Sequence, residues 1–241
     1  MAKAIVVIPT YNEIENIESI INAVFSLPTS FHILIVDDNS PDGTSKKVAE
    51  LQKEFVEKLF LEVRTKKSGL GTAYVHGFKW ALAKEYDYIF EMDADFSHNP
   101  KDLEELLYAC EVENADVAIG SRYSTGVNVV NWPLNRVLMS YFASVYVKII
   151  TGMKIHDATA GFICYRRKVL ENIKLDRIKF IGYAFQIEMK YRAYAQKLKI
   201  VEVPIIFTDR TKGQSKMSGS IIREAVFGVI LLRIRKLFNT L

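Results

Sequence analysis

The sequence predicts an α/β fold in which a mainly parallel sheet is flanked by helices. Through the first half of the chain, short apolar runs of strand type alternate with stretches of helical periodicity. This alternating order implies parallel strands with right-handed crossovers. With 241 residues, 49% of them hydrophobic and 25% charged, the chain is long enough to bury a sizeable core. We therefore expect one domain over residues 1–241.

The first strand is expected at residues 4–8, which are wholly apolar and lead into polar residues at 9–13. A helix is then expected over 15–27, where Ile17, Ile20, Ile21 and Val24 recur at helical spacing. A second apolar run, 33–36, predicts the next strand.

Residues 39–44 combine turn and capping residues and should open a helix that continues through residue 57. A strand is expected at 59–64, and Gly69 and Gly71 precede a helix over 73–84. The remaining elements of this half are a strand at 86–92, a helix at 100–110 and a strand at 116–120.

Two apolar stripes mark the second half of the chain, at residues 134–150 and 220–238. Their periodicity alone favours helices that face the core. The second stripe ends in Arg233, Arg235 and Lys236, which is also typical of a helix lying at a membrane interface with its bases near the headgroups. Both readings stay open at this point.

Composition narrows the class of protein. The formal net charge is +4, and residues 201–241 carry seven basic against three acidic residues, which points to anionic partners such as phosphates, a membrane surface or nucleic acid. Cys110 and Cys164 lie in apolar surroundings and are expected to be buried thiols. The N-terminus lacks signal-peptide form, and apolar runs such as 226–232 fall short of the roughly 20 residues of a membrane span. A soluble or peripheral protein is expected.

The most informative motif is Asp93-Ala94-Asp95, directly after a predicted strand. Asp37 and Asp38 end an earlier strand, and Glu13 follows the first one. Carboxyl ends of parallel strands meet at one edge of the sheet, where open α/β folds bind ligands. Clustered carboxylates there would suit a hard divalent cation that bridges to phosphate oxygens.

Basic residues could complete such a site. Arg122 follows the strand at 116–120 and could bind a diphosphate. Arg210 and Lys216 belong to a glycine-containing basic segment, 209–216, that could fold over phosphates, although such a segment is commonly just solvated. His98 is a lone histidine and suits a structural place or a metal neighbour better than a base. The chain has no phosphate loop, no dinucleotide-binding glycine motif and no nucleic-acid module.

Taken together, the segments 7–13, 36–44, 69–74, 92–98, 120–123, 158–162, 182–188 and 209–216 resemble the family 2 glycosyltransferases, most closely their dolichyl-phosphate (polyprenyl-phosphate) mannosyltransferase branch. The resemblance extends over nearly the whole chain. It implies a GT-A fold and inverting transfer of mannose from GDP-mannose to a polyprenyl or dolichyl phosphate, with Mg²⁺ or Mn²⁺ as cofactor.

The resemblance also implies site residues. Donor binding is implied for Pro9, Tyr11, Glu13, Val36, Asp38, Asp93, Ala94, Asp95, Arg122, Arg210 and Lys216. Asp95, Arg210 and Lys216 are expected to act in catalysis, and Arg136 to bind the acceptor phosphate. The metal ligands would be Asp93, Asp95 and Ser97, where some relatives have Gln in place of Ser97.

No general base is expected. Many family 2 enzymes place an acidic motif near residues 186–188, but a phosphomonoester is already largely ionised at neutral pH and is itself the nucleophile. Glu188 is therefore read as a structural or acceptor-orienting carboxylate.

Many relatives carry C-terminal membrane spans, and this chain resembles the short form without them. We expect it at the cytoplasmic face of a membrane, reached through surface helices at 134–150 and 220–238 or through an anchoring protein. Two alternatives remain: the same chemistry with UDP-glucose or another nucleotide sugar, and a non-catalytic nucleotide- or lipid-binding subunit.

Overall fold

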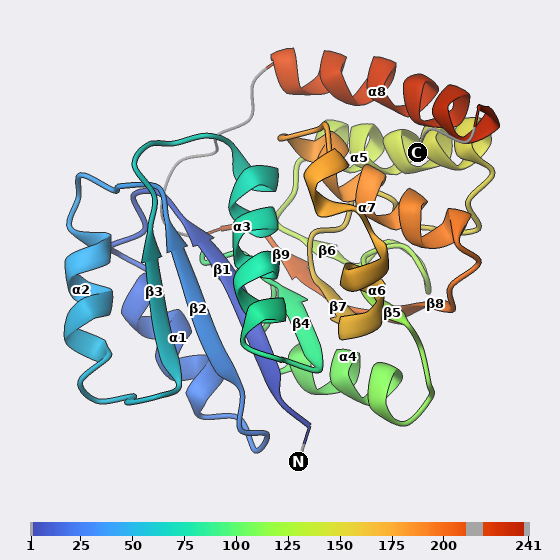
Figure 1. Ribbon diagram of the computed structural model, residues 1–241. Helices are drawn as coiled ribbons and strands as arrows, with labels where there is room; N and C mark the ends of the chain where they lie inside the picture. Colours follow the sequence, from blue (N-terminus) through green and yellow to red (C-terminus); the bar gives the residue numbers. More distant parts are fainter. Residues whose placement is uncertain (1, 211–218, 239–241) are drawn as a thin grey trace.

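The central sheet has seven strands in the order β3-β2-β1-β4-β7-β5-β8 (Figure 1). The computed structural model describes residues 2–210 and 219–238. The strands are, in that order, β3 (Leu59–Val63), β2 (His32–Asp37), β1 (Ala4–Thr10), β4 (Tyr88–Glu91), β7 (Ile163–Arg166), β5 (Val117–Ser121) and β8 (Ile200–Pro204). β7 runs antiparallel to both of its neighbours, and the other pairs are parallel. The predicted mainly parallel sheet is confirmed, with one reversed strand that the sequence did not reveal.

A separate two-stranded ribbon joins β6 (Val129–Val130) to β9 (Phe207–Thr208). The helices are α1 (Ile17–Phe25), α2 (Thr44–Leu51), α3 (Leu70–Ala83), α4 (Asp102–Glu111), α5 (Leu134–Thr151), α6 (Arg167–Asn172), α7 (Tyr183–Ala195) and α8 (Gly219–Leu237), with a 3₁₀ turn at Leu175–Arg177. The prediction that the second helix continues through residue 57 is wrong. It ends at Leu51, and Glu57 takes a φ of 61°, which a right-handed helix does not allow.

The sheet has a hydrophobic core on each face because successive strand side chains alternate. In β1, Ile5 and Val7 join the core beneath α3, α6 and α7, whereas Val6 and Ile8 join the one beneath α1, α2 and α4. α3 lies against β1 so closely that any Cβ at Gly77 would clash with Val7. Both faces are thus covered, which leaves the strand ends as the place for a site.

α5 and α8 form an outer layer over α7 (Figure 1). The buried residues of α8 include Val229 and Leu232, and its Val226 carbonyl accepts a hydrogen bond from Tyr146 of α5 at 2.9 Å. Both helices also expose large apolar side chains: Leu134, Leu138, Met139, Tyr141, Phe142 and Ile149 on α5, and Val226, Phe227, Ile230, Leu231, Ile234 and Leu237 on α8.

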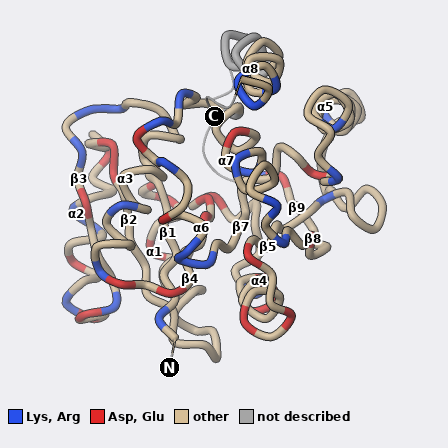
Figure 2. The backbone as a smooth tube through the Cα atoms, turned by 45° about the vertical axis from the view of Figure 1, so that its right-hand side comes forward, with Lys and Arg blue, Asp and Glu red and all other residues tan. Residues whose placement is uncertain are grey.

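Charged residues are sparse along α5, whereas α8 carries basic residues toward its C-terminal end and acidic residues gather on α4 (Figure 2). We call the exposed apolar side chains of α5 and α8, named in the preceding paragraph, the apolar face. Within residues 2–210 and 219–238, no helix combines the length and apolar character needed to cross a membrane.

Candidate active site

The carboxyl ends of β2, β1 and β4 lie side by side, as predicted, because these strands are parallel neighbours. Asp37, at the end of β2, is fully buried and accepts hydrogen bonds from Thr10 Oγ1 at 2.8 Å and from Ser40. It therefore fixes the strand end. Asp38 forms an ion pair with Arg64 at 2.5 Å and accepts from the Ser68 amide.

The remaining residues predicted to hold the nucleotide lie along this edge. Pro9 is half-buried and paired in register with Val36. Val36 is fully buried in the core, so it could meet a nucleotide only through its main chain. Tyr11 is half-buried, and the centroid of its ring lies 4.3 Å from Lys67 Nζ. The Glu13 carboxylate accepts a hydrogen bond from the Asn16 side-chain amide.

Asp93 and Asp95 follow β4 and differ sharply in their surroundings. Burial and the neighbouring charge of Asp95 raise the pKa of Asp93 to about 7. Burial would also raise the pKa of Asp95, but hydrogen bonds from Ser97 and the charge of Arg210 hold it below its usual range. Arg210 Nη2 lies 3.1 Å from Asp95 Oδ2. Two crowded carboxylates, one of which resists ionisation, suit an added cation.

The donor set fits a cation that shares its shell with phosphates. Among the described residues, no three His, Cys, Asp or Glu side chains converge as a metal cluster. Asp93 and Asp95 would supply two carboxylates, and Mg²⁺-type sites commonly use one or two carboxylates together with substrate phosphates and water. Ser97 is buried beside them, and Ala94 is buried between them.

His98 completes this turn. Its ring stacks on Phe162 at 4.8 Å, and its Nδ1 lies 3.5 Å from the Asp93 amide. Burial lowers the pKa of His98 to about 4, so the ring is neutral near pH 7. The structure thus places His98 as a packed neighbour of the carboxylates.

A cavity of about 360 Å³ opens beside Asp93. At one end it is polar, with Asp93, Arg122, Arg136, Arg210 and Gln186. At the other it is apolar and reaches α5, α7 and α8, through Met139, Tyr146, Val147, Ile187, Val226 and Val229. A second hollow, of about 480 Å³, is lined by residues that include Asp95, Thr208 and Asp209.

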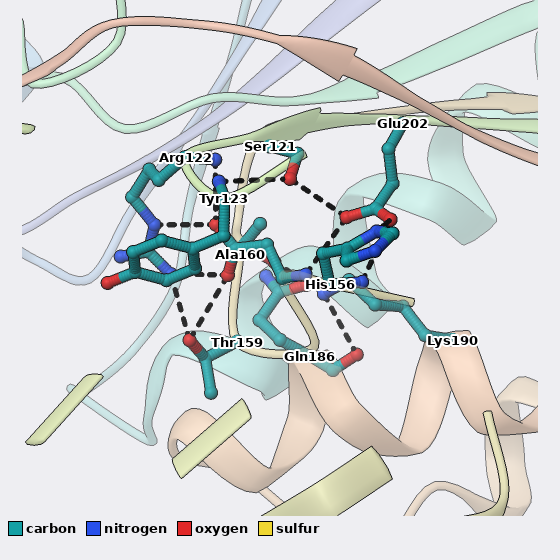
Figure 3. Close-up of polar contacts among 10 residues, drawn as sticks. Ser121, Arg122, Tyr123, His156, Thr159, Ala160, Gln186, Lys190 and Glu202 are labelled. Atoms are coloured by element: carbon teal, nitrogen blue, oxygen red, sulfur yellow. Dashed lines mark hydrogen bonds and ion pairs between the residues drawn. The ribbon is translucent and has the colours of Figure 1, made fainter. Parts of the chain in front are cut away.

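Arg122 is brought to the cavity, but most of its guanidinium group is already engaged. Its Nε and Nη2 donate to the two oxygens of Asp157 at 2.7 and 2.6 Å, and Nη2 also reaches Thr159 (Figure 3). The side chains are 9% and 0% exposed. Burial would raise the pKa of Asp157, but the Arg122 charge holds it below its usual range.

The loop that carries Asp157 is itself held at both ends. Glu202 of β8 accepts from the amides of His156 and Asp157 and from Ser121 Oγ (Figure 3). Lys190 Nζ, from α7, donates to the Ala160 carbonyl at 2.5 Å.

Sequence reasoning missed a group of buried charges beneath the cavity. Glu91, at the end of β4, accepts a hydrogen bond from Gln186 Nε2 and is fully buried, as is Lys190. Burial raises the pKa of Glu91 to about 7 and lowers that of Lys190 to about 8. A carboxylate inside an apolar strand was the available signal for Glu91. Asp157 and Lys190 had no local signal.

The predicted acceptor residue, Arg136, lines the same cavity. Its Nη1 donates to Asp209 Oδ1 at 2.8 Å, and its guanidinium lies 4.1 Å from the ring centroid of Trp132. Glu188 is fully buried, paired with Arg192 and bonded to the amides of Lys179 and Phe180, so it has a structural place. Lys216 lies outside the described residues.

Comparison with known proteins places these features in context. The family model described as glycosyl transferase family 2 matches residues 5–174. Polyprenol monophosphomannose synthase of Mycolicibacterium smegmatis is 48% identical over 227 residues, covering 94% of this chain and 85% of the relative. Undecaprenyl-phosphate mannosyltransferase of Micrococcus luteus is 43% identical over 227 residues, covering 94% and 92%.

Among solved structures, glucosyl-3-phosphoglycerate synthase of Mycobacterium tuberculosis, crystallised with Mn²⁺, UDP and glucosyl-3-phosphoglycerate, superimposes with a TM-score of 0.69 at 16% identity. The match covers 98% of this chain and 80% of that one. At this identity the likeness establishes the fold alone, and it confirms the predicted GT-A architecture.

Proposed function

The chain belongs to glycosyl transferase family 2, and from that premise we propose that it transfers mannose from GDP-mannose to a polyprenyl phosphate such as dolichyl phosphate. The products are polyprenyl phosphate mannose and GDP, with inversion at the anomeric carbon. The names of two relatives, a polyprenol monophosphomannose synthase and an undecaprenyl-phosphate mannosyltransferase, support both the sugar and the lipid phosphate.

One structural observation carries the proposal. The cavity joins a cluster of three arginines, Arg122, Arg136 and Arg210, to an apolar end beneath α5 and α8. A phosphate on a hydrocarbon chain has this same division into an anionic head and an apolar tail. Arg136 is the arginine of this cluster that is assigned to the acceptor phosphate, since Trp132 holds its guanidinium plane at the cavity wall.

The donor is assigned to the edge formed by β2, β1 and β4. Tyr11, Glu13 and Asp38 would hold the guanosine, with Pro9 and the main chain of Val36 beside them. Asp93 and Asp95 would bind Mg²⁺ or Mn²⁺, which when bound offsets the charge of the diphosphate. Arg210, and Lys216 by motif, would stabilise the departing GDP.

The chemistry needs alignment more than proton transfer. A phosphomonoester has a second pKa near 6, so the acceptor oxygen is already nucleophilic at neutral pH. Arg136 would aim this oxygen at the anomeric carbon, and binding both substrates in one cavity makes the attack effectively intramolecular. Since the acceptor is already ionised, no carboxylate is required as a base, and Glu91 and Glu188 are both fully buried.

The apolar face of α5 and α8 supports attachment to a membrane surface, which for this substrate class we assign to the cytoplasmic side. A long polyprenyl chain stays in the bilayer, so the phosphate must be met at the surface. The apolar end of the cavity reaches both helices, which would place the arginine cluster close to the headgroups.

The test is a donor panel with purified protein. GDP-mannose, UDP-glucose and UDP-GlcNAc, each with a labelled sugar, are offered with polyprenyl phosphate and Mg²⁺ or Mn²⁺. We expect label in the lipid phase from GDP-mannose only, with a β-linked product by NMR, and Asp95→Ala should lose nearly all turnover. Preference for a UDP-sugar would reject the donor, full turnover in excess chelator would reject the metal, and no transfer at all would favour a binding subunit.

A further inference from the structure

Asp209 and Arg210 are adjacent in sequence and pair with two different residues of the site, Arg136 and Asp95. Asp209 Oδ1 accepts from Arg136 Nη1 at 2.8 Å, and Arg210 Nη2 lies 3.1 Å from Asp95 Oδ2. The two pairs are also linked directly, because the Arg210 amide donates to the same Asp209 oxygen at 3.1 Å. Asp209 is thus bonded to Arg136, the arginine that we assign to the acceptor phosphate. The adjacent Arg210 is paired with Asp95, a carboxylate that we assign to the metal.

The backbone around this dipeptide connects the same two places. The Thr208 amide donates to the Ser97 carbonyl at 3.2 Å, beside the Asp93–Asp95 turn. The Asp209 amide donates to the Val130 carbonyl at 3.0 Å, in the strand that leads into α5 and Arg136. A ligand that displaced Arg210 from Asp95 would therefore act one peptide unit away from Asp209.

Exposure separates this pair from the other arginine pair of the cavity. Arg136 and Asp209 side chains are 26% and 29% exposed, whereas those of Arg122 and Asp157 are 9% and 0% exposed. A partly exposed pair with one short contact is weak and exchanges readily. A phosphomonoester dianion carries more charge and more acceptor oxygens than a carboxylate, so it can replace Asp209 on Arg136.

We propose that Asp209 is a positioning residue that covers Arg136 until the nucleotide sugar is bound, so that the lipid phosphate enters after the donor. The inference rests on the proposed function for the identity of both ligands. A metal and diphosphate bound at Asp95 would draw the Arg210 side chain away and shift the peptide unit that it shares with Asp209, which would free Arg136. Trp132 keeps the arginine in place during the exchange. Linkage then requires that donor and acceptor strengthen each other's binding.

The experiment measures binding of geranyl phosphate, a short soluble isoprenyl monophosphate, by calorimetry without turnover. For the wild-type protein we expect GDP with Mn²⁺ to tighten geranyl phosphate binding by roughly two- to fivefold, the scale of an exposed ion pair. Asp209→Asn should bind geranyl phosphate with the tighter constant even without GDP. In transfer assays it should lower the apparent KM for the lipid and leave kcat unchanged, and Asp209→Glu should restore the wild-type coupling.

Two controls isolate the contact. Asp176→Asn removes the same charge from an exposed pair with Lys79 outside the cavity, and should leave geranyl phosphate binding unchanged. In an Arg136→Ala background, Asp209→Asn should have no further effect, as a double-mutant cycle requires of a direct contact.

The proposal is overturned if Asp209→Asn binds geranyl phosphate no more tightly than the wild type, or if Asp176→Asn has an equal effect. Wild-type transfer is measured first. If it is absent, the proposed function fails, while the calorimetric comparison still decides whether Asp209 covers an anion site at Arg136.

Discussion

The cavity has two walls that treat charge in opposite ways. We call Arg122 and Gln186 of the cavity lining, together with Asp157, Glu91 and Lys190 behind them, the inner wall; these residues are buried and bonded to one another. We call Arg136 and Arg210 of the cavity lining, together with Asp209 beside them, the outer wall; these side chains are partly exposed and joined by the Arg136–Asp209 and Arg210–Asp95 pairs. Removing one partner from a buried pair is costly, whereas an exposed pair gives up its partner easily. We therefore expect the ion pairs of the inner wall to persist when ligands bind, and those of the outer wall to exchange their partners for ligand groups.

Asp157→Ala tests the inner wall and should have the largest effect. It would leave the Arg122 guanidinium buried without its carboxylate, and we expect a loss of about 3–5 kcal/mol in the free energy of unfolding. Urea denaturation followed by circular dichroism measures this loss. The matched change on the outer wall, Asp209→Ala, should cost less than about 1 kcal/mol. Similar losses from both variants would mean that burial does not distinguish the walls.

Arg136→Ala tests the outer wall through function. Charge-assisted hydrogen bonds contribute about 1.5–3 kcal/mol, so the apparent KM for the lipid phosphate should rise by roughly 10- to 100-fold. The KM for the nucleotide sugar and the unfolding free energy should change little. Arg136→Lys, which keeps the charge without the planar fork, should fall between the two proteins. Equal rises in both KM values would count against an acceptor role.

Glu91→Gln sharpens the comparison through pH. The folded-state pKa of Glu91 is raised from 4.5 to about 7 by burial, so the folded protein holds a proton that the unfolded chain releases. The unfolding free energy should therefore fall as pH rises from about 4.5 to about 7. The Gln variant should show a fall smaller by roughly 2 kcal/mol.

Denaturation curves at half-unit pH steps measure this difference. Lys190 has a pKa of about 8 and titrates above this window. Asp93 titrates within it and its charge interacts with Glu91, so the difference between the two proteins includes this interaction. Parallel pH profiles for the two proteins would show that folding does not raise the pKa of Glu91.

The smallest effect is expected at the apolar face. Phe227→Ala removes an exposed ring of α8 and should weaken binding to anionic liposomes by roughly fivefold to tenfold, as the loss of apolar burial predicts. Flotation at low and high salt measures this, and salt should weaken binding by both proteins. Val56→Ala, an equally exposed apolar position after α2, is the control. Wild-type protein that does not float at low salt would refute the membrane proposal.

The sequence predicted the features that depend on neighbouring residues, such as strands and the residues that follow them. It did not predict contacts between residues far apart in the chain. Asp38, Asp93 and Asp95 follow apolar runs, so strand periodicity located them at one edge of the sheet, and the motifs pointed to the correct family. α2 was predicted six residues too long because the turns at 52–58 are set by tertiary packing and not by periodicity.

The inner wall could not be predicted from the sequence because its residues lie far apart in the chain. Arg122 and Asp157 are 35 residues apart, and Glu91 and Gln186 are 95 apart. Such pairs form only when β4, the 156–161 loop and α7 come together. Arg122 was consequently predicted to contact the donor directly, whereas the structure shows that most of its donors are bound to Asp157 and Thr159.

The reversed strand β7 also constrains how the chain assembles. β1 to β4 form one contiguous block of neighbouring strands. Of the pairings within it, β1 with β4 joins the strands that lie farthest apart in the sequence. β5 has no partner in that block, because both of its neighbours, β7 and β8, come later in the chain. During synthesis the first four strands could settle while β5 waits for at least residue 163. An exposed unpaired strand is prone to aggregation, so this interval is where a nascent chain would most need a chaperone.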